Sequence, residues 1–326
     1  MRWLERQWYL PSYTLETFLL LPLAGLFQLA VSIRRFLYRR GILKTVYVNA
    51  PVIVVGNITV GGTGKTPFVL WLAAYLKQQG YRPGIVTRGV GGQVQHVPYR
   101  VEKNADPSKV GDEALVLVNR SFCPVMVGVD RVAAVQTLLQ TTDCNVIISD
   151  DGLQHYRMGR QIEIALIDGE RRLGNKTFLP SGPLRESAKR LQSVDCIVVQ
   201  QGDVNDRFTM QLRGDTLVSL VDPHRTLPLT HFRHQTVHAL AGIGNPDRFF
   251  TLLRHEQVDI VPHIFPDHAS YCKKDILFKD ALPVVMTEKD AVKCLSFADE
   301  RHWYLPVTAH LTHAFEDEMN NLMRSL

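Results

Sequence analysis

Short apolar runs of five to seven residues recur along the chain, separated by polar or glycine-rich segments. Many are rich in valine and isoleucine, as is typical of strands buried on both faces of a parallel sheet. We predict such strands at residues 51–55, 83–87, 124–129, 145–149, 162–167, 194–199, 236–241, 258–264 and 283–287. Helical periodicity between several of them, as at residues 132–140 and 247–255, predicts an α/β fold with helices on both faces of a parallel sheet.

The pattern changes at the N-terminus, where residues 15–33 are apolar almost throughout. The apolar side chains surround the expected helix, and about twenty helical residues match the thickness of a bilayer's hydrocarbon core. Arginines follow at positions 34, 35, 39 and 40, which favours a cytoplasmic location for the rest of the chain. We expect residues 1–45 to contact a membrane, with a helix that either spans it or dips into one leaflet. The alternative is a hydrophobic helix packed on the domain core.

A glycine-rich loop separates the first predicted strand from a helix. The stretch APVIVVGNITVGGTGKT covers residues 50–66 and has the strand–loop–helix order of a P-loop, although Thr59 replaces the first glycine of the strict pattern. Backbone N–H groups of such a loop bind phosphate, while the lysine reaches the β- and γ-phosphates and the final hydroxyl binds Mg²⁺. A tight turn without a ligand is the alternative. The predicted phosphate-binding residues are Gly61, Gly62, Thr63, Gly64, Lys65 and Thr66.

Carboxylates follow two other segments of the predicted sheet. Asp150 and Asp151 end the run at 145–149, and two adjacent carboxylates are costly unless a cation compensates them. Together with a P-loop upstream, this pair predicts a Mg²⁺ site, and a simple turn is the alternative. Asp112 precedes a helical run, and its position fits a helix N-cap as well as a residue of the ligand site. Further along, Arg185 and Glu186 lie in a proline-containing loop and could contact phosphate and metal, respectively.

Composition and segment boundaries suggest three parts. The 326 residues are 45% hydrophobic and 21% charged, which is enough to bury a sizeable core. From residue 201 to 235, short β-like pieces alternate with turn residues, and we place a domain boundary near residue 235. The expected parts are a membrane-associating segment at 1–45, a P-loop domain at 46–235 and a smaller α/β unit at 236–326.

The net charge of +5 is modest, and the chain has no recognition-helix, zinc-finger or RNA-binding signature, so we expect no nucleic-acid partner. The five scattered cysteines read as free thiols of a reducing compartment. One rival function is a P-loop GTPase or metallochaperone, a nucleotide-driven switch. Residues 287–290 resemble its guanine-binding tetrad, but the lysine is one place late. A membrane adaptor that only binds nucleotide is a second rival, and it leaves Asp112 and Asp150 unexplained.

Several longer segments carry a resemblance to one family. They are VGNITVGGTGKTP, TRGVGG, VGDEA, SDDGLQHYRM, LPSGPLRE, AGIGNPDRFF, FPDH and TEKDAVK, in this order behind a hydrophobic N-terminus. The chain thereby resembles the tetraacyldisaccharide 4'-kinases, the lipid A 4'-kinases of Gram-negative bacteria, over nearly its whole length. That family shares Thr59. Val90 and Ala114 stand where the family pattern has Tyr and Pro, departures that concern loop rigidity.

The resemblance implies transfer of the ATP γ-phosphoryl group to the 4'-hydroxyl of an acylated glucosamine disaccharide 1-phosphate. The reaction would use Mg²⁺ at the cytoplasmic face of the inner membrane. Asp112 would accept the proton of the sugar hydroxyl, with His268 as its partner. The site residues implied in this way are catalytic Asp112, His268, Asp151 and Lys65, phosphate-binding Arg185 with the loop residues named above, and metal-binding Thr66, Asp150 and Glu186.

Overall fold

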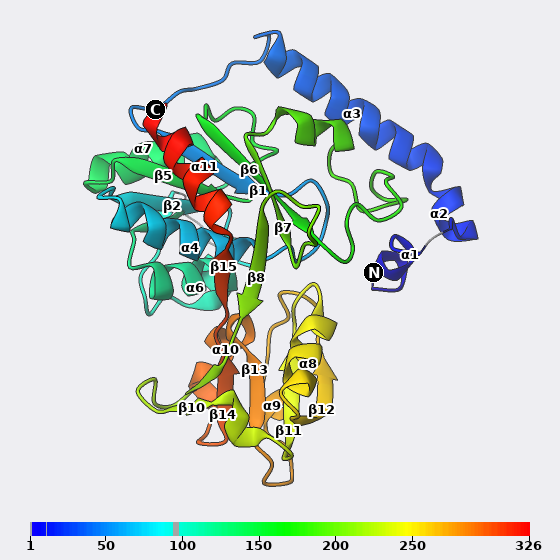
Figure 1. Ribbon diagram of the computed structural model, residues 1–326, viewed down its shortest axis with the longest axis vertical. Coiled ribbons are helices and arrows are strands. Elements are labelled where there is room, and N and C mark those ends of the chain that lie inside the picture. Colours follow the sequence, from blue (N-terminus) through cyan, green and yellow to red (C-terminus); the bar gives the residue numbers. More distant parts are fainter. Residues whose placement is uncertain (1, 11, 94–97) are drawn as a thin grey trace.

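The computed structural model describes residues 2–10, 12–93 and 98–326, which form two β-sheets (Figure 1). The strands of the larger sheet are β1 (Val52–Gly56), β2 (Pro83–Thr87), β3 (Tyr99–Arg100), β4 (Val125–Val127), β5 (Val146–Asp150), β6 (Ile162–Asp168), β7 (Cys196–Gln200), β8 (Thr209–Arg213) and β15 (Thr308–Leu311). Their spatial order is β15-β8-β7-β6-β1-β5-β2-β4-β3. The edge strands β15 and β3 are antiparallel to their neighbours, and the others run parallel.

Helices cover both faces of this sheet, as the sequence predicts. Side chains of β1 alternate between two cores: Ile53 and Val55 pack in one, and Val52 and Val54 in the other. The first core contains side chains of α4 (Lys65–Gln78), α6 (Asp112–Ser121) and α11 (His313–Arg324). The second contains side chains of α7 (Arg131–Thr141) and α3 (Leu21–Arg39). Continuous β-branched runs suit the central strands because both of their faces are buried.

The smaller sheet forms a second α/β unit below the first in Figure 1. Its strands are β9 (Thr216–Ser219), β10 (Thr226–Pro228), β11 (Thr236–Ala241), β12 (Asp259–Ile264), β13 (Val284–Thr287) and β14 (His302–Leu305), in the order β10-β9-β14-β13-β11-β12. The unit also contains α8 (Pro246–His255), α9 (Lys273–Ile276) and α10 (Glu288–Cys294).

The two units exchange segments at positions that differ from the expected boundary at residue 235. Strand β9 already belongs to the smaller sheet at residue 216, and β15 and α11 return to the larger one after residue 307. Residues 214–215 alone connect β8 to β9, and residues 306–307 alone connect β14 to β15. Links of two residues are too short to show a linker-like composition. The pattern of apolar residues therefore does not reveal where the chain passes from one sheet to the other.

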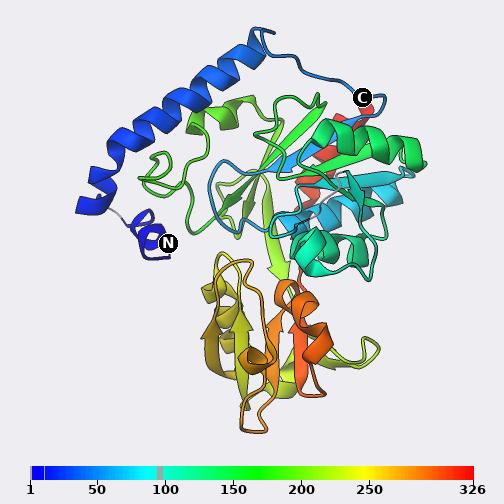
Figure 2. The same ribbon diagram turned by 180° about the vertical axis from the view of Figure 1, so that it is seen from behind.

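The N-terminal segment forms α1 (Arg2–Gln7), α2 (Leu15–Leu19) and α3, and α3 runs along the outside of the larger unit (Figure 2). Pro22 lies in the first turn of α3, a position that tolerates proline, and a new helix starts there. The Ser181 hydroxyl donates to the Thr17 carbonyl at 2.6 Å, tying α2 to the larger unit. Among the described residues, no helix combines the length and apolar character needed to cross a membrane. Membrane contact stays a prediction.

Candidate active site

The predicted phosphate-binding loop lies at the carboxyl end of β1 and leads directly into α4. Gly64 caps this helix with a left-handed backbone, φ 77°, and a Cβ there would lie 2.9 Å from Cε of Met210. Gly61 also has a positive φ, 115°. Glycine is required where such conformations coincide with close packing. The strand, loop and helix therefore have the arrangement that presents backbone N–H groups and a helix N-terminus to an anion.

Asn57 organises the charged side chains beside this loop. Its Oδ1 accepts hydrogen bonds from Lys65 Nζ at 3.3 Å and from Arg185 Nη1 at 3.0 Å. Arg185 also binds both Asp151 oxygens at 2.9 Å, and Lys65 Nζ lies 3.7 Å from Asp151. Burial alone would raise the pKa of Asp151, but Lys65 and then Arg185 outweigh it and lower that pKa. Three of the predicted site residues, Lys65, Asp151 and Arg185, thus lie together beside the P-loop.

Asp150 has the properties of a cation ligand. It ends β5 with its side chain buried, and Oδ2 accepts a hydrogen bond from the Thr87 hydroxyl at 3.1 Å, whereas Oδ1 is buried without a hydrogen-bond partner among the described residues. Burial, followed by the charges of Glu113 and Asp151, raises the pKa of Asp150 above its usual range. A buried carboxylate oxygen of this kind is costly unless a cation binds it. The unpartnered Oδ1 of Asp150 is therefore suited to be one ligand of Mg²⁺.

Glu186 differs from Asp150, because protein donors occupy its carboxylate. Its Oε1 accepts from Gln154 Nε2 at 2.8 Å, and its Oε2 accepts from the Tyr156 hydroxyl and lies 3.5 Å from Arg190 Nε. The same Gln154 amide donates to the Asn57 carbonyl at 2.9 Å, so Glu186 is connected to the P-loop through Gln154. This arrangement favours a role in positioning the loop over the direct metal ligation predicted from the sequence.

Asp112 and His268 meet across the two units. Asp112 is the first residue of α6 and is 3% exposed, and Gly111 rather than Asp112 occupies the N-cap position. His268 Nδ1 lies 3.0 Å from Asp112 Oδ1 and 3.2 Å from Oδ2. Burial opposes the charged carboxylate, but His268, Lys289 and Lys293 together lower the pKa of Asp112. The hydrogen bond to Asp112 is the main reason that the pKa of His268 is raised.

Two lysines of α10 surround this pair. Lys293 Nζ lies 3.4 Å from Asp112 Oδ2. Lys289 Nζ lies 3.1 Å from Glu113 Oε1 and 3.5 Å from His268 Nε2. The two lysines are four residues apart, so they project from the same face of the helix. Together with the His268 hydrogen bond, their charges lower the pKa of Asp112 although it is buried.

Two close backbone approaches connect the smaller unit to the P-loop and to the surroundings of the pair. A Cβ at Gly244, in the loop before α8, would lie 3.0 Å from the Gly62 nitrogen. Gly91 is adjacent to His268, since a Cβ there would lie 3.5 Å from Nδ1. Glu113, next to Asp112 in the chain, raises the pKa of Asp150 by its charge. An acceptor group beside Asp112 would therefore lie on the same side of the larger unit as Asp150, whose pKa responds to the neighbouring Glu113.

The sequence did not reveal the roles of Asn57, Gln154, Lys289 and Lys293. Asn57 and Gln154 stand inside the quoted segments VGNITVGGTGKTP and SDDGLQHYRM, beside residues whose roles are more familiar. The two lysines belong to TEKDAVK, a segment of the family resemblance whose first four residues are also similar to a guanine-binding tetrad. Their four-residue spacing within a short helical segment was the available signal.

Comparison with known proteins identifies the family. The family model described as Tetraacyldisaccharide-1-P 4'-kinase matches residues 16–324. The chain belongs to this family. It is 49% identical over 320 residues to a tetraacyldisaccharide 4'-kinase of Nitrosococcus oceani, covering 98% of this chain and 94% of that protein. A kinase of the same name from Methylobacillus flagellatus is 45% identical over 320 residues, with 98% and 95% covered.

A solved structure of this family has the same fold. It is the crystal structure of the "apo" form of LpxK from Aquifex aeolicus in complex with ATP. The TM-score is 0.78 at 26% sequence identity, with 95% of this chain and 99% of that chain covered. The α/β architecture predicted from the sequence is thereby confirmed.

Proposed function

We propose that this protein transfers the γ-phosphoryl group of ATP to the 4'-hydroxyl of an acylated glucosamine disaccharide 1-phosphate, a reaction of lipid A biosynthesis. Membership of the tetraacyldisaccharide 4'-kinase family supports the reaction type. The structural observation that carries the proposal is the hydrogen bond of the half-buried His268 to the buried Asp112, whose chain neighbour Glu113 raises the pKa of Asp150 by its charge. A nucleotide switch needs no such group, because its acceptor is water positioned by the nucleotide site.

The P-loop and the carboxylates beside it suit ATP with Mg²⁺. The loop from Gly61 to Thr66 would bind the phosphates, with Lys65 and Arg185 neutralising their charge. Asp150 and the Thr66 hydroxyl would hold Mg²⁺, which supplies charge stabilisation of the transferring group. Mg²⁺ is commonly bound by one or two carboxylates together with substrate phosphates, so this small set of protein ligands is sufficient.

The Asp112–His268 pair would remove the acceptor's proton. Lys289 Nζ faces His268 Nε2, so the neutral ring carries its proton on Nδ1. This N–H group donates a hydrogen bond to the Asp112 carboxylate. The carboxylate, whose pKa is lowered by His268, Lys289 and Lys293, retains lone pairs for the proton of the 4'-hydroxyl. As that O–H bond breaks, the sugar oxygen forms its bond to the γ-phosphorus, and the bond from that phosphorus to the leaving oxygen of ADP breaks.

We further propose that the protein works at the cytoplasmic face of the inner membrane, held there by α2 and α3. The support is a row of exposed apolar side chains on the outer side of these helices: Leu15, Phe18, Leu19, Leu23, Leu26, Leu29, Ile33 and Phe36. Large apolar surfaces of this kind mark membrane or protein contacts. An acylated acceptor lies in the bilayer, so this placement brings the site to its substrate.

The test is the acceptor dependence of ATP turnover. Purified full-length protein is incubated with γ-labelled ATP, Mg²⁺ and the acylated disaccharide 1-phosphate in detergent. Label should appear in the lipid, and little ATP should be consumed without the acceptor. Hydrolysis that ignores the acceptor would indicate a switch, and the absence of any turnover would indicate an adaptor.

A further inference from the structure

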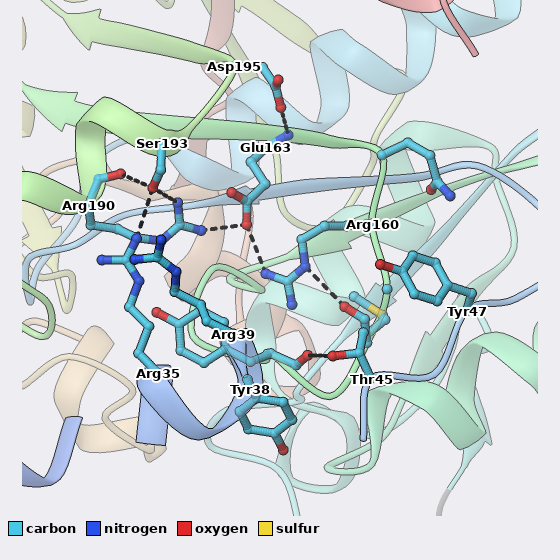
Figure 3. Close-up of a pocket in the computed structure, with 14 residues that line it drawn as sticks. Arg35, Tyr38, Arg39, Thr45, Tyr47, Arg160, Glu163, Arg190, Ser193 and Asp195 are labelled. Carbon is cyan, nitrogen blue, oxygen red and sulfur yellow. Dashed lines mark hydrogen bonds and ion pairs between the residues drawn. The ribbon is translucent and has the colours of Figure 1, made fainter. Parts of the chain in front are cut away.

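A cavity of about 440 Å³ lies between the end of α3 and the larger sheet (Figure 3). The residues at 156–161 that line it precede β6, and Ser193 and Asp195 precede β7. The Val52 nitrogen, at the start of β1, donates to the side chain of the lining residue Gln161 at 2.7 Å. The cavity therefore lies at the amino edge of the parallel strands, whereas the P-loop and Asp150 lie at the carboxyl edge. It is separate from the candidate active site.

The cavity is positively charged. Four arginines and two carboxylates line it: Arg35, Arg39, Arg160, Arg190, Glu163 and Asp195. Glu163 is shared by two of the arginines, with Arg160 Nη1 at 3.0 Å from Oε1. Asp195 accepts a hydrogen bond from the Glu163 nitrogen at 2.7 Å. Within residues 2–10, 12–93 and 98–326, neither Arg35 nor Arg39 has a carboxylate within 4.0 Å.

Two of these cations converge on one hydroxyl group. Ser193 Oγ accepts hydrogen bonds from Arg35 Nη2 at 3.0 Å and from Arg190 Nη1 at 2.9 Å (Figure 3). Glu163 and Glu186 already compensate the charge of Arg190, so Arg35 is the member of this pair that has no carboxylate partner among the described residues. A phosphate group suits the position because guanidinium groups present planar pairs of donors that match its oxygens. The volume is within the range of about 300–1,000 Å³ that is typical of ligand pockets.

The surroundings favour a lipid phosphate over a free one. Arg35 and Arg39 belong to the helix whose outer side exposes Leu29, Ile33 and Phe36, so lipid chains packed on that side would begin beside the cavity. Aromatic side chains also line the cavity: Tyr38 and Tyr156 have ring centroids 5.8 Å apart, and Tyr47 is exposed. Tyrosines are enriched at the headgroup level of membranes, and basic pockets there bind anionic headgroups.

We propose that this cavity binds the phosphate headgroup of an anionic glycerophospholipid, fixing the orientation of α3 at the membrane surface. The inference rests on the proposed membrane association and adds a specific site to it. Non-specific attraction would depend on the net charge of the helix, whereas a site depends on which arginines line the cavity. The chain offers a matched control, because Arg34 of α3 and Arg40, the C-cap residue of that helix, are exposed but do not line the cavity.

The experiment uses a soluble short-chain lipid, so that no membrane surface potential contributes. Binding of dihexanoyl phosphatidylglycerol to the full chain is measured by calorimetry, below its micelle concentration, for wild type, Arg35→Gln/Arg39→Gln and Arg34→Gln/Arg40→Gln. We expect saturable binding of one lipid, weakened by about tenfold or more in the cavity pair because charge-assisted hydrogen bonds are lost. The control pair should bind like wild type. Equal losses in the two pairs would overturn the site.

Two further measurements are included. One distinguishes a lipid phosphate from free phosphate, and the other separates the cavity proposal from the proposal of membrane association. Inorganic phosphate that binds wild type as tightly as the lipid does would overturn the lipid assignment in favour of a free anion. If the double variant unfolds, Arg39→Gln is compared with Arg40→Gln, and the same difference is expected between them. Sedimentation of wild type with phosphatidylcholine and phosphatidylglycerol vesicles tests the membrane association itself. Wild type that binds the soluble lipid but neither vesicle would contradict only that association.

Discussion

The Nδ1 atom of His268 lies 3.0 Å from Oδ1 of Asp112, and this hydrogen bond joins the two sheet-containing units of the chain. Asp112 starts α6 of the larger unit, and His268 follows β12 of the smaller one. Lys293 of the smaller unit lies 3.4 Å from the same carboxylate, and Lys289 pairs with the neighbouring Glu113. Residues of the smaller unit therefore lower the pKa of Asp112, the proposed proton acceptor in the larger unit.

The Asp112–His268 contact predicts a change in the titration of His268. Because the hydrogen bond to Asp112 is the main cause of the raised pKa, Asp112→Asn should lower the pKa of His268. Lys289, 3.5 Å from Nε2, then remains as a charge that disfavours the imidazolium. The measurement is an NMR titration of the His268 ring in wild type and variant. A pKa that stays the same would show that the two groups do not interact in solution.

Lys293 should contribute to the acid limit of activity, after His268 and Lys289. Asp112 must be ionised to accept a proton, and Lys293 helps to lower its pKa, so activity extends to lower pH than for an ordinary buried carboxylate. In Lys293→Met the pKa of Asp112 rises, and the acid limb of the kcat/KM profile should move to higher pH. Lys274→Met, an exposed lysine of the same unit, is the control. Identical acid limbs in the two variants would contradict the role of Lys293.

Asp150 should control the Mg²⁺ requirement. Its Oδ1 is buried without a hydrogen-bond partner among the described residues, so Asp150→Asn removes a ligand charge and should raise the Mg²⁺ concentration needed for half-maximal activity. Asp106→Asn is a suitable control, because Asp106 caps a short helix through Ser108 at the surface. The measurement is kinase rate against free Mg²⁺ at saturating ATP. An unchanged Mg²⁺ requirement in Asp150→Asn would exclude direct ligation.

The outer side of α3 should account for membrane binding. Replacing Leu26, Leu29 and Ile33, which are 65%, 56% and 49% exposed, by glutamine removes apolar surface without opening the core. We expect the triple variant to lose sedimentation with vesicles while keeping its melting temperature and its activity on detergent-dispersed acceptor. Deleting residues 1–33 is a less specific test, since Thr17 and Trp8 hydrogen-bond to the 180–181 segment. Unchanged sedimentation of the triple variant would place the membrane contact elsewhere.

Local patterns predicted the central strands well. The runs at residues 83–87 and 236–241 agree with β2 and β11 because continuous β-branched or apolar segments are specific for buried parallel strands. The P-loop was also predictable, since its glycines and Lys65 are contiguous. The exchange of strands between the sheets was not predictable, because a two-residue link is too short to show a linker-like composition.

The arrangement of the site depends on contacts between distant parts of the chain. Asp112 and His268 are 156 residues apart, and their pairing was implied by the family resemblance, not by any local pattern. Glu186 looked like a metal ligand because it follows Arg185 in an ordered loop, yet Gln154 and Tyr156 occupy its oxygens. Which carboxylate retains an unpartnered oxygen is decided by tertiary packing.

A double-mutant cycle on Asp112 and His268 tests the central claim most directly. The single-turnover rate of γ-phosphoryl transfer to the acylated disaccharide 1-phosphate is measured for wild type, Asp112→Asn, His268→Ala and the double variant. Asp112→Asn should reduce the rate by about a hundredfold or more with little change in ATP affinity, and His268→Ala should reduce it less. If the two act as one proton-accepting unit, the double variant should be about as slow as Asp112→Asn alone. Losses that multiply fully, or a near wild-type rate in Asp112→Asn, would contradict the unit.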